Sequence, residues 1–363
     1  MLVIGAGPAG SVAALVLARA GLSVTLVAPD ERAGFAIGEG LPPAARPVLA
    51  ALGLGARIDA QGHRQAIGNR SAWGSERLAA ADFIMHPFGH GWHLDRRAFD
   101  RDLREAAREA GAIAVAGSFR SIDGEPGAWR VGIATDHGNS TIATDVVIDC
   151  SGRRALFARR LGARRNRLDR LVACAALFTT AATDADATTL IEAMEEGWWY
   201  TAPLPNASRI VMFLTDSDLQ SAHDVRAPMP FRTRLAQTRH VGPLCVGCGY
   251  EIASPLRMVA ADTGRLDVVC GEGWYAAGDA AASFDPISSQ GIMSAMQFGQ
   301  RAAEAVLHGS PAAYAAAVDA LYERYRSMRA TVYAQERRWA HAPFWARRHR
   351  DVPLLGPFAL RTR

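Results

Sequence analysis

The sequence contains no lysine, and all 40 of its Lys and Arg positions are arginine. The chain therefore has no side-chain amine for a Schiff base or for relaying an activated oxidant. The arginines are spread along the whole chain, which favours a solvated surface over a nucleic-acid groove. We expect neither lysine-dependent catalysis nor a nucleic-acid partner.

Cysteine is also scarce, with five residues in 363. A sparse, odd set favours a reducing compartment, and we expect a cytoplasmic protein. Cys245-Val-Gly-Cys248 has the spacing of a metal or redox pair, but structural zinc needs four ligands and no second pair exists. We predict no metal site.

Long apolar runs are missing as well. None reaches the length of a transmembrane helix, and Leu2 to Ile4 leads into glycines rather than into a secretory signal. A hydrophobic content of 49% and a charged content of 21% are typical of globular proteins. The sequence predicts no membrane partner.

The opening residues have the pattern of a dinucleotide-binding unit. A short apolar strand runs into Gly5-x-Gly7-x-x-Gly10, which is followed by a helix and by a second strand at Ser23 to Val27. The first glycine permits a tight turn, the second lets the backbone approach a pyrophosphate, and the third lets helix pack on strand. Ala28 stands where such units usually carry a ribose-binding acid.

A second stretch, Trp274 to Ile292, also has the features of a cofactor site. An apolar strand ends in Gly278-Asp279, and a helix opens near Gln290-Gly291. An Asp at a strand end can accept hydrogen bonds from a polyol chain, and the free N–H groups of a helix start favour an electron-rich ring. A flavin needs both. The alternative is a strand, turn and helix with incidental Gly and Asp.

Three other segments contain candidate cofactor contacts. A glycine-rich loop includes Gly38 and Glu39, and loops of this kind can lie across a cofactor. Arg96 follows Asp95, the expected N-cap of a helix, and is placed either to clamp a phosphate or to hold that loop. A later apolar strand delivers Asp149 and Gly152. The alternatives are that the glycine-rich loop is a plain connector and that Arg96 faces solvent.

Residues 171–265 alternate strand-like runs with polar loops, which predicts an antiparallel substrate domain. Trp198, Trp199 and Tyr200 are adjacent there. Neighbours in a strand point to opposite faces, so at least one should face a cavity or a partner. His90 and His93, in an aromatic segment before the helix, are candidates for proton shuttling or for structural roles.

Together these motifs resemble those of FAD-dependent monooxygenases of the aromatic-hydroxylase and tryptophan-halogenase superfamily. The matching residues are Gly5 to Gly10, Gly38-Glu39-Gly40-Leu41-Pro42, Asp95-Arg96-x-x-Phe99-Asp100, Asp149-x-x-Gly152-Arg153, and Gly278-Asp279 with Pro286 and Gly291. Gly197-Trp-Trp-Tyr-Thr-Ala-Pro203 and Asp285-Pro-Ile-Ser-Ser-Gln-Gly291 are most similar to the branch that holds tryptophan halogenases and the maturation flavoproteins. The latter hydroxylate peptidyl tryptophan in quinone cofactor biogenesis.

The resemblance implies an α/β fold with three parts. A Rossmann-like FAD-binding domain of the glutathione-reductase type and aromatic-hydroxylase topology would comprise residues 1–70, 94–165 and 266–310. An antiparallel β substrate domain would comprise residues 71–93 and 166–265, and a C-terminal helical region residues 311–363. The implied FAD contacts are Gly5, Gly7, Pro8, Ala9, Gly10, Gly38, Glu39, Arg96, Asp149, Gly152, Gly278, Asp279, Pro286, Gln290, Gly291 and Ile292.

The resemblance also implies a reaction. Halogenases of this type carry a catalytic lysine that relays hypohalous acid, and this chain has none. We therefore expect a monooxygenase that uses O2 and a flavin C4a-hydroperoxide to hydroxylate an aromatic ring, foremost a tryptophan of a peptide or partner protein. Its electrons would come from NAD(P)H or a separate flavin reductase. The candidate catalytic residues are His90, His93, Trp199 and Tyr200. A small-aromatic hydroxylase of secondary metabolism, a flavin-dependent reductase and a structural flavoprotein are the alternatives.

Overall fold

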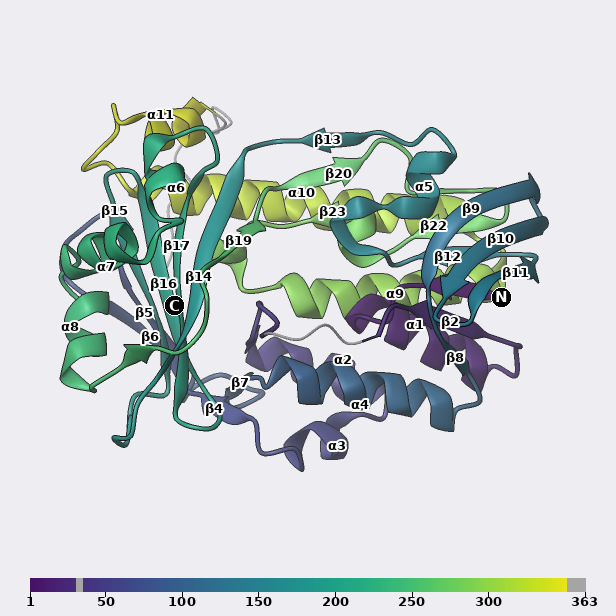
Figure 1. Cartoon of the computed structure of the whole chain (residues 1–363), viewed down its shortest axis with the longest axis horizontal. Helices are drawn as coiled ribbons and strands as arrows, with labels where there is room; N and C mark the ends of the chain where they lie inside the picture. Colours follow the sequence, from purple (N-terminus) through teal and green to yellow (C-terminus); the bar gives the residue numbers. More distant parts are fainter. Residues whose placement is uncertain (31–34, 351–363) are drawn as a thin grey trace.

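The computed structural model describes residues 1–30 and 35–350. Two ranges lie outside the described residues: 31–34 and 351–363. The second range is the last part of the predicted C-terminal region. Figure 1 shows two bodies side by side, one built around a parallel sheet and one around an antiparallel sheet. Within the described residues, no helix is both long enough and apolar enough to span a membrane.

The first body contains a six-stranded sheet in the order β21-β22-β12-β1-β2-β8. Strand β1 lies in the middle and pairs in parallel with β2 and β12, as a dinucleotide-binding unit requires. Only β21 at the edge runs antiparallel to its neighbour. The strands are β1 (Leu2–Ile4), β2 (Thr25–Ala28), β8 (Ile113–Ala116), β12 (Val147–Asp149), β21 (Cys270–Gly271) and β22 (Trp274–Ala276).

Three long helices lie beside this sheet, and the first packs against the other two: α1 (Pro8–Arg19), α4 (Arg96–Glu109) and α9 (Gly291–His308). Helices α1 and α9 approach closely because Gly299 has no side chain. A Cβ there would lie 2.1 Å from the carbonyl oxygen of Ala9. Asp95 accepts hydrogen bonds from the backbone N–H groups of Arg97 and Ala98, so the predicted N-cap of α4 is confirmed.

Smaller elements complete the first body. A meander, two further three-stranded sheets and several short helices connect its main elements. They are β9 (Ser118–Glu125), β10 (Ala128–Thr135) and β11 (Gly138–Thr144); β3 (Gly40–Leu41), β4 (Arg64–Ala66) and β7 (Gly91–His93); β13 (Arg165–Arg167), β20 (Gly264–Leu266) and β23 (Ala282–Ser283); η1 (Pro43–Ala45), α2 (Arg46–Ala51), α3 (Gly55–Asp59), η2 (Gly152–Arg154), α5 (Leu156–Arg160), η3 (Gly278–Ala280) and η4 (Pro286–Ser288).

The second body is an eight-stranded, mostly antiparallel sheet in the order β18-β14-β17-β16-β15-β5-β6, with β19 also paired to β14. Its strands are β5 (Gly68–Ala72), β6 (Ala79–Asp82), β14 (Leu171–Thr179), β15 (Thr188–Met194), β16 (Gly197–Leu204), β17 (Ser208–Asp216), β18 (Glu251–Ile252) and β19 (Arg257–Ala260). Three helices accompany it: α6 (Gln220–Asp224), α7 (Pro228–Ala236) and α8 (Val241–Gly247).

The two faces of β16 enter different cores. Trp198 and Tyr200 point to one side, where they join a cluster with residues of the C-terminal helices. Trp199 points to the other side, into a cluster with Phe213 and Phe231. This alternation follows from the two-residue period of a strand.

The C-terminal region consists of α10 (Pro311–Gln335) and α11 (Pro343–Arg350). In Figure 1, α10 reaches from the first body to the second, and α11 lies at the end of the antiparallel sheet. Phe344 and Trp345 are fully buried, and Trp345 Nε1 donates to the carbonyl oxygen of Met194 at 2.9 Å. These aromatic residues anchor the C-terminal region.

Two boundaries differ from the expected domain division. Strand β5 pairs with β15, Gly68 lying opposite Thr188, so the antiparallel sheet begins before residue 71. Strand β7 pairs instead with β3 and β4, because His93 lies opposite Gly40 and Arg64. Residues 91–93 thus belong to a small sheet beside the first body.

Candidate cofactor and substrate site

A cavity of about 420 Å³ lies between the two bodies. The first body lines it with Gly7, Pro8, Ala9, Ile37, Gly38, Glu39, Gly40, Arg96, Cys150, Gly152, Arg153, Ala277, Asp279, Phe284, Asp285, Pro286, Ser289, Gly291, Ile292 and Ala295. The antiparallel sheet and the segment after it contribute Ala173, Tyr200, Met212, Val259, Ala260 and Ala261. One wall is therefore made of loops and helix starts, and the other is mainly apolar.

The three glycines of the first motif have different surroundings. A Cβ at Gly5, whose φ is +104°, would lie 2.2 Å from the Cys150 carbonyl oxygen, and one at Gly10 would lie 1.8 Å from that of Gly5. A Cβ at Gly7 would meet nothing within 4 Å. Gly5 and Gly10 thus allow close packing behind the cavity, whereas Gly7 leaves open space in front of it.

Helix α1 starts at this open space with no side-chain cap and no acidic residue in its first turn. Its first backbone N–H groups have no partner within the helix, and their dipoles favour an anion. The open approach at Gly7 and the uncapped N–H groups fit a pyrophosphate.

Asp279 lies at the far side of the cavity with its carboxylate 41% exposed. Arg153 Nε is 3.5 Å from its Oδ2, and Arg165 donates to its carbonyl oxygen at 2.9 Å. Arg153 also donates to Asp262 Oδ1 at 3.1 Å and to Ser283 Oγ at 3.0 Å. Asp279 is held in place by these arginines and keeps a free side for a polar ligand.

The segment from Asp285 through η4 to the start of α9 forms another part of the wall. Asp285 Oδ1 accepts from the backbone N–H of Ile287 at 2.9 Å, and Ser289 adopts a left-handed conformation with φ of +50°. Helix α9 then begins without a side-chain cap or an acidic first turn. Its free N–H groups and positive dipole end suit an electron-rich ring.

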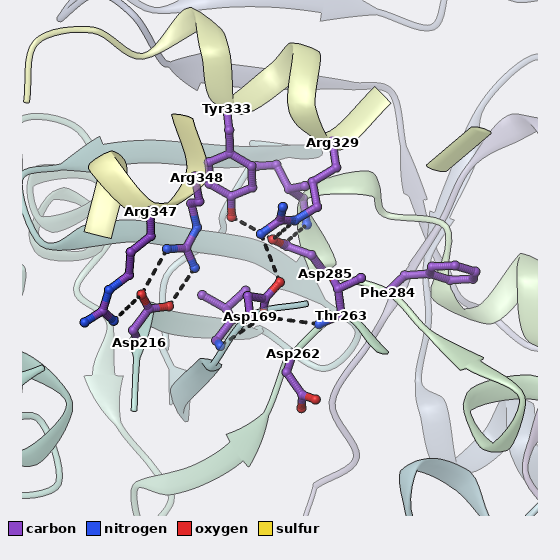
Figure 2. A network of polar contacts seen from close by, with 12 residues as sticks. Asp169, Asp216, Asp262, Thr263, Phe284, Asp285, Arg329, Tyr333, Arg347 and Arg348 are labelled. Atoms are coloured by element: carbon purple, nitrogen blue, oxygen red, sulfur yellow. Dashed lines mark hydrogen bonds and ion pairs between the residues drawn. The ribbon is translucent and has the colours of Figure 1, made fainter. Parts of the chain in front are cut away.

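Residues of α10 fix this segment from behind, as Figure 2 shows. Tyr333 Oη donates to Asp285 Oδ2 at 2.7 Å, and Arg329 Nε lies 3.4 Å from the same oxygen. The backbone N–H of Asp285 donates to Tyr325 Oη at 2.8 Å. Asp285 is fully buried, so these contacts replace its hydration.

The same network extends to the antiparallel sheet. Arg329 Nη2 lies 2.9 Å from Asp169 Oδ2, and Arg348 Nη2 lies 2.8 Å from Asp216 Oδ1 (Figure 2). Asp216 ends β17, and Asp169 precedes β14. We call Asp169, Asp216, Asp285, Arg329, Tyr333 and Arg348 the tail network, because it joins the C-terminal helices to both bodies.

Arg96 holds the loop at Ile37 to Gly40. Its Nη1 donates to the carbonyl oxygens of Ile37 at 2.9 Å and Gly38 at 2.7 Å, and its Nη2 pairs with Asp100 at 3.0 Å. Of the two roles predicted for Arg96, this geometry corresponds to holding the loop. Glu39 is only 3% exposed and faces Tyr200. Burial raises the pKa of Glu39, although hydrogen bonds from Tyr200 and Gly38 and the charge of Arg96 oppose the shift.

The four predicted catalytic residues lie in different places relative to the cavity. Tyr200 lines the cavity. His93 lies behind it, fully buried, with Nε2 3.1 Å from Thr189 Oγ1, and burial together with Arg209 and Arg64 lowers its pKa to about 3. His90 does not line the cavity; its Nδ1 bonds the Gly91 carbonyl at 2.8 Å and its ring packs edge-on against Trp92.

The prediction for Trp199 is wrong. Its ring lies on the opposite face of β16, 5.1 Å from the rings of Phe213 and Phe231. It is fully buried there and cannot reach the cavity. Trp198 and Tyr200 take the face toward the cavity, so the period of the strand excludes Trp199.

Asp149 is a second correction. Its carboxylate is fully buried and accepts from the backbone N–H groups of Ser151, Phe157 and Ala158 at 2.9, 2.9 and 3.0 Å. It therefore caps α5 rather than contacting a cofactor. Four further predicted contacts lie just behind the cavity wall without lining it: Gly5, Gly10, Gly278 and Gln290.

Sequence reasoning missed the residues of the apolar wall. Ala173, Met212, Val259 and Ala261 are ordinary strand residues, and no local signal distinguishes them from a core. Arg153 also lines the cavity and could have been predicted, because it directly follows the predicted contact Gly152. In the described part of the chain no group of His, Cys, Asp and Glu is arranged to hold a metal ion. For Cys245, of the Cys-x-x-Cys pair, burial raises the thiol pKa to about 12, which disfavours the thiolate that binds a metal.

Comparisons with known proteins show the family and the fold of the chain. The family model described as tryptophan halogenase matches residues 1–90 and 65–355. An FAD-dependent oxidoreductase of Marinomonas mediterranea, LodB, is 29% identical over 356 residues, covering 96% of each chain. The solved structure of CmlS, a flavin-dependent halogenase, is similar with a TM-score of 0.85 and 26% identity, over 96% of this chain and 66% of CmlS.

A second similar structure is the peptidyl tryptophan dihydroxylase QhpG, which is essential for tryptophylquinone cofactor biogenesis. Its TM-score is 0.74 with 24% identity, and the match covers 96% of this chain and 77% of QhpG. The predicted α/β fold and the predicted cofactor, FAD, are confirmed by these matches. The chain belongs to the tryptophan halogenase family.

Proposed function

We propose that the protein is an FAD-dependent monooxygenase that hydroxylates an aromatic ring, with a tryptophan side chain of a peptide or partner protein as its substrate. The observation that carries this proposal is the complete absence of lysine from a chain of this family. Halogenases of the type that this chain resembles relay hypohalous acid through a catalytic lysine. This chain has no lysine side chain and so lacks that relay. Oxygen transfer from the flavin to an electron-rich ring needs no such group.

The cavity supplies what FAD requires. The uncapped start of α1 at Gly7 would hold the pyrophosphate, Asp279 the ribityl hydroxyl groups, and the start of α9 at Gly291 the negative charge of the reduced ring. When bound, reduced FAD supplies the electrons that activate O2. We infer that NAD(P)H or a separate flavin reductase supplies these electrons.

The other wall suits an aromatic substrate. Ala173 and Ala261 are small, and Met212 and Val259 are apolar, so this side of the cavity excludes water and leaves room for a ring. Tyr200 and Glu39 are polar groups that face the same space. An indole is electron-rich by nature, so the residues must orient it more than activate it.

The similar proteins support the proposal unequally. LodB matches over nearly its whole length and is described as an oxidoreductase, and QhpG is described as a hydroxylase of peptidyl tryptophan. CmlS is described as a halogenase, and this chain spans 66% of its length. Halogenation is thus the competing activity that an experiment must test.

The test is to reduce the FAD-loaded protein in air, with chloride and bromide present, and to offer free tryptophan, tryptophan-containing peptides and small phenols. Mass spectrometry should show a gain of ~16 or ~32 mass units on a peptide and none on free tryptophan. Oxygen on the small aromatics alone would favour a small-molecule hydroxylase. A halogen on any substrate would contradict the proposal.

A further inference from the structure

A chain of four buried polar side chains leads from the cavity into the space between the sheets. Glu39 and Tyr200 line the cavity and are 3% and 4% exposed. The Tyr200 hydroxyl lies beside the Glu39 carboxyl and Thr189, close enough for each to act on its pKa. Thr189 Oγ1 lies 3.1 Å from His93 Nε2, and His93 is fully buried. We call these residues the Glu39 chain.

The far end of the Glu39 chain is a neutral histidine. Burial, Arg209 and Arg64 lower the pKa of His93 to about 3, against the charge of Asp186, so its ring is neutral at neutral pH. Among the described residues, the buried Nδ1 of His93 has no hydrogen-bond partner. Nε2, 3.1 Å from Thr189 Oγ1, is therefore the ring atom through which His93 joins the Glu39 chain.

Within residues 1–30 and 35–350, Glu39 forms no ion pair. The charge of Arg96 acts on Glu39, but its guanidinium is shared between Asp100 and two backbone carbonyl oxygens. Arg209 acts on Tyr200 but pairs directly with Asp184 at 2.7 Å. Burial raises the pKa of Glu39 above that of an exposed glutamate, which shifts the balance toward its proton-bearing form.

We propose that Glu39 is the acid–base residue of the cavity and that Tyr200, Thr189 and His93 are positioning residues that hold its side chain. This assignment rests on the proposed hydroxylation. Hydroxylation of a ring C–H bond by O2 consumes two electrons and two protons and yields the hydroxylated ring and water. The electrons come from FAD reduced by NAD(P)H or by a reductase.

The proposed role of Glu39 follows from the two proton transfers that hydroxylation requires. The oxygen atom that leaves as water gains a proton, and the ring carbon that gains the hydroxyl group loses one. Glu39 donates its proton to that oxygen, and its carboxylate then takes the proton from the ring carbon, so it ends in its starting form. A neutral acid that is held in place can perform both transfers.

The first test asks whether Glu39 carries a proton. Infrared difference spectra of the oxidised, FAD-loaded protein at neutral pH, native against Glu39→Gln, should show one C=O band of a protonated carboxyl group. Tyr200→Phe should shift this band, because it removes a hydrogen-bond partner. Tyr250→Phe, a buried tyrosine that bonds Asp184 at 2.7 Å, is the matched control and should leave it unchanged. Absence of the band overturns the proposal.

The second test asks whether that proton is used. Glu39→Gln should bind FAD and be reduced at the native rate, yet hydroxylate the peptide about 100-fold or more slowly and release peroxide instead. Hydroxylation at the native rate overturns the proposal. If Glu39→Gln fails to bind FAD, Tyr200→Phe provides the same comparison and should show a smaller loss with an altered pH profile. If the native protein inserts no oxygen into any substrate, the proposed function fails, and the infrared band still tests the proton on Glu39 separately.

Discussion

The tail network and the Glu39 chain are equally buried but differ in charge. In the tail network each buried carboxylate meets a guanidinium, as Asp285 and Asp169 meet Arg329 and Asp216 meets Arg348. In the Glu39 chain the carboxyl group meets a tyrosine hydroxyl and the histidine meets a threonine. Ion pairing keeps a buried group charged and fixed, whereas burial without a counter-ion keeps it neutral and available for proton transfer.

The largest effect should come from breaking the tail network at Arg329. Its guanidinium is 2% exposed, and Arg329→Gln would leave Asp285 and Asp169 without their cation. We expect a loss of about 3–5 kcal/mol in the free energy of unfolding, because unpaired buried charges are costly. Denaturant titration measures it.

Arg326→Gln, on the same helix, is the matched control. Arg326 pairs with Glu323 at 3.1 Å at the surface, its side chain 43% exposed, and its loss should cost at most about 0.5 kcal/mol. Equal losses for the two variants would show that the tail network contributes no more than a surface ion pair.

The second effect concerns His93. Its pKa of about 3 in the folded protein lies below that of an unfolded histidine, about 6.5. The stability from keeping it neutral is therefore complete above about pH 6.5 and is lost as the pH falls toward about 3. In His93→Gln this dependence disappears, so the difference in unfolding free energy between the two proteins should change by roughly 1.4 kcal/mol per pH unit below about pH 6. A difference that is constant from pH 7.5 to 4.5 would contradict a neutral His93.

The smallest effects on the free energy of unfolding should come from removing one tyrosine hydroxyl from the tail network and one from the Glu39 chain. Tyr333→Phe removes a donor to the buried Asp285 and an acceptor for Trp198 Nε1 at 3.2 Å. We expect a loss of about 1.5–3 kcal/mol, typical of a hydrogen bond to a charged group. Tyr200→Phe should cost about 0.5–1.5 kcal/mol if its neighbour Glu39 is neutral, as proposed. Thermal or chemical unfolding of both variants compares them, and a larger loss for Tyr200→Phe would mean that Glu39 is charged.

Much of the cavity wall formed by the first body could be predicted from the sequence. The glycines at positions 5, 7 and 10, the cap at Asp95 and the helix start at Gly291 lie within single turns, where local spacing determines geometry. Asp149 was misassigned because a carboxylate at a strand end can cap the next helix as readily as it can bind a ligand.

The sheet side could not be predicted in the same way. Alternation shows that Trp199 and its neighbours face opposite ways, but not which face borders the cavity. That depends on pairing with strands and helices far away in the chain, such as β15, β17 and the C-terminal helices. The Glu39 chain likewise joins residues 39, 93, 189 and 200, which only the folded sheets bring together.

The most direct test of oxygen insertion is to supply ¹⁸O2 to the reduced, FAD-loaded protein with a tryptophan-containing peptide and excess bromide. We expect ¹⁸O on the indole ring of the peptide and no bromine. A brominated peptide, or oxygen that comes from water instead of from O2, would contradict the account.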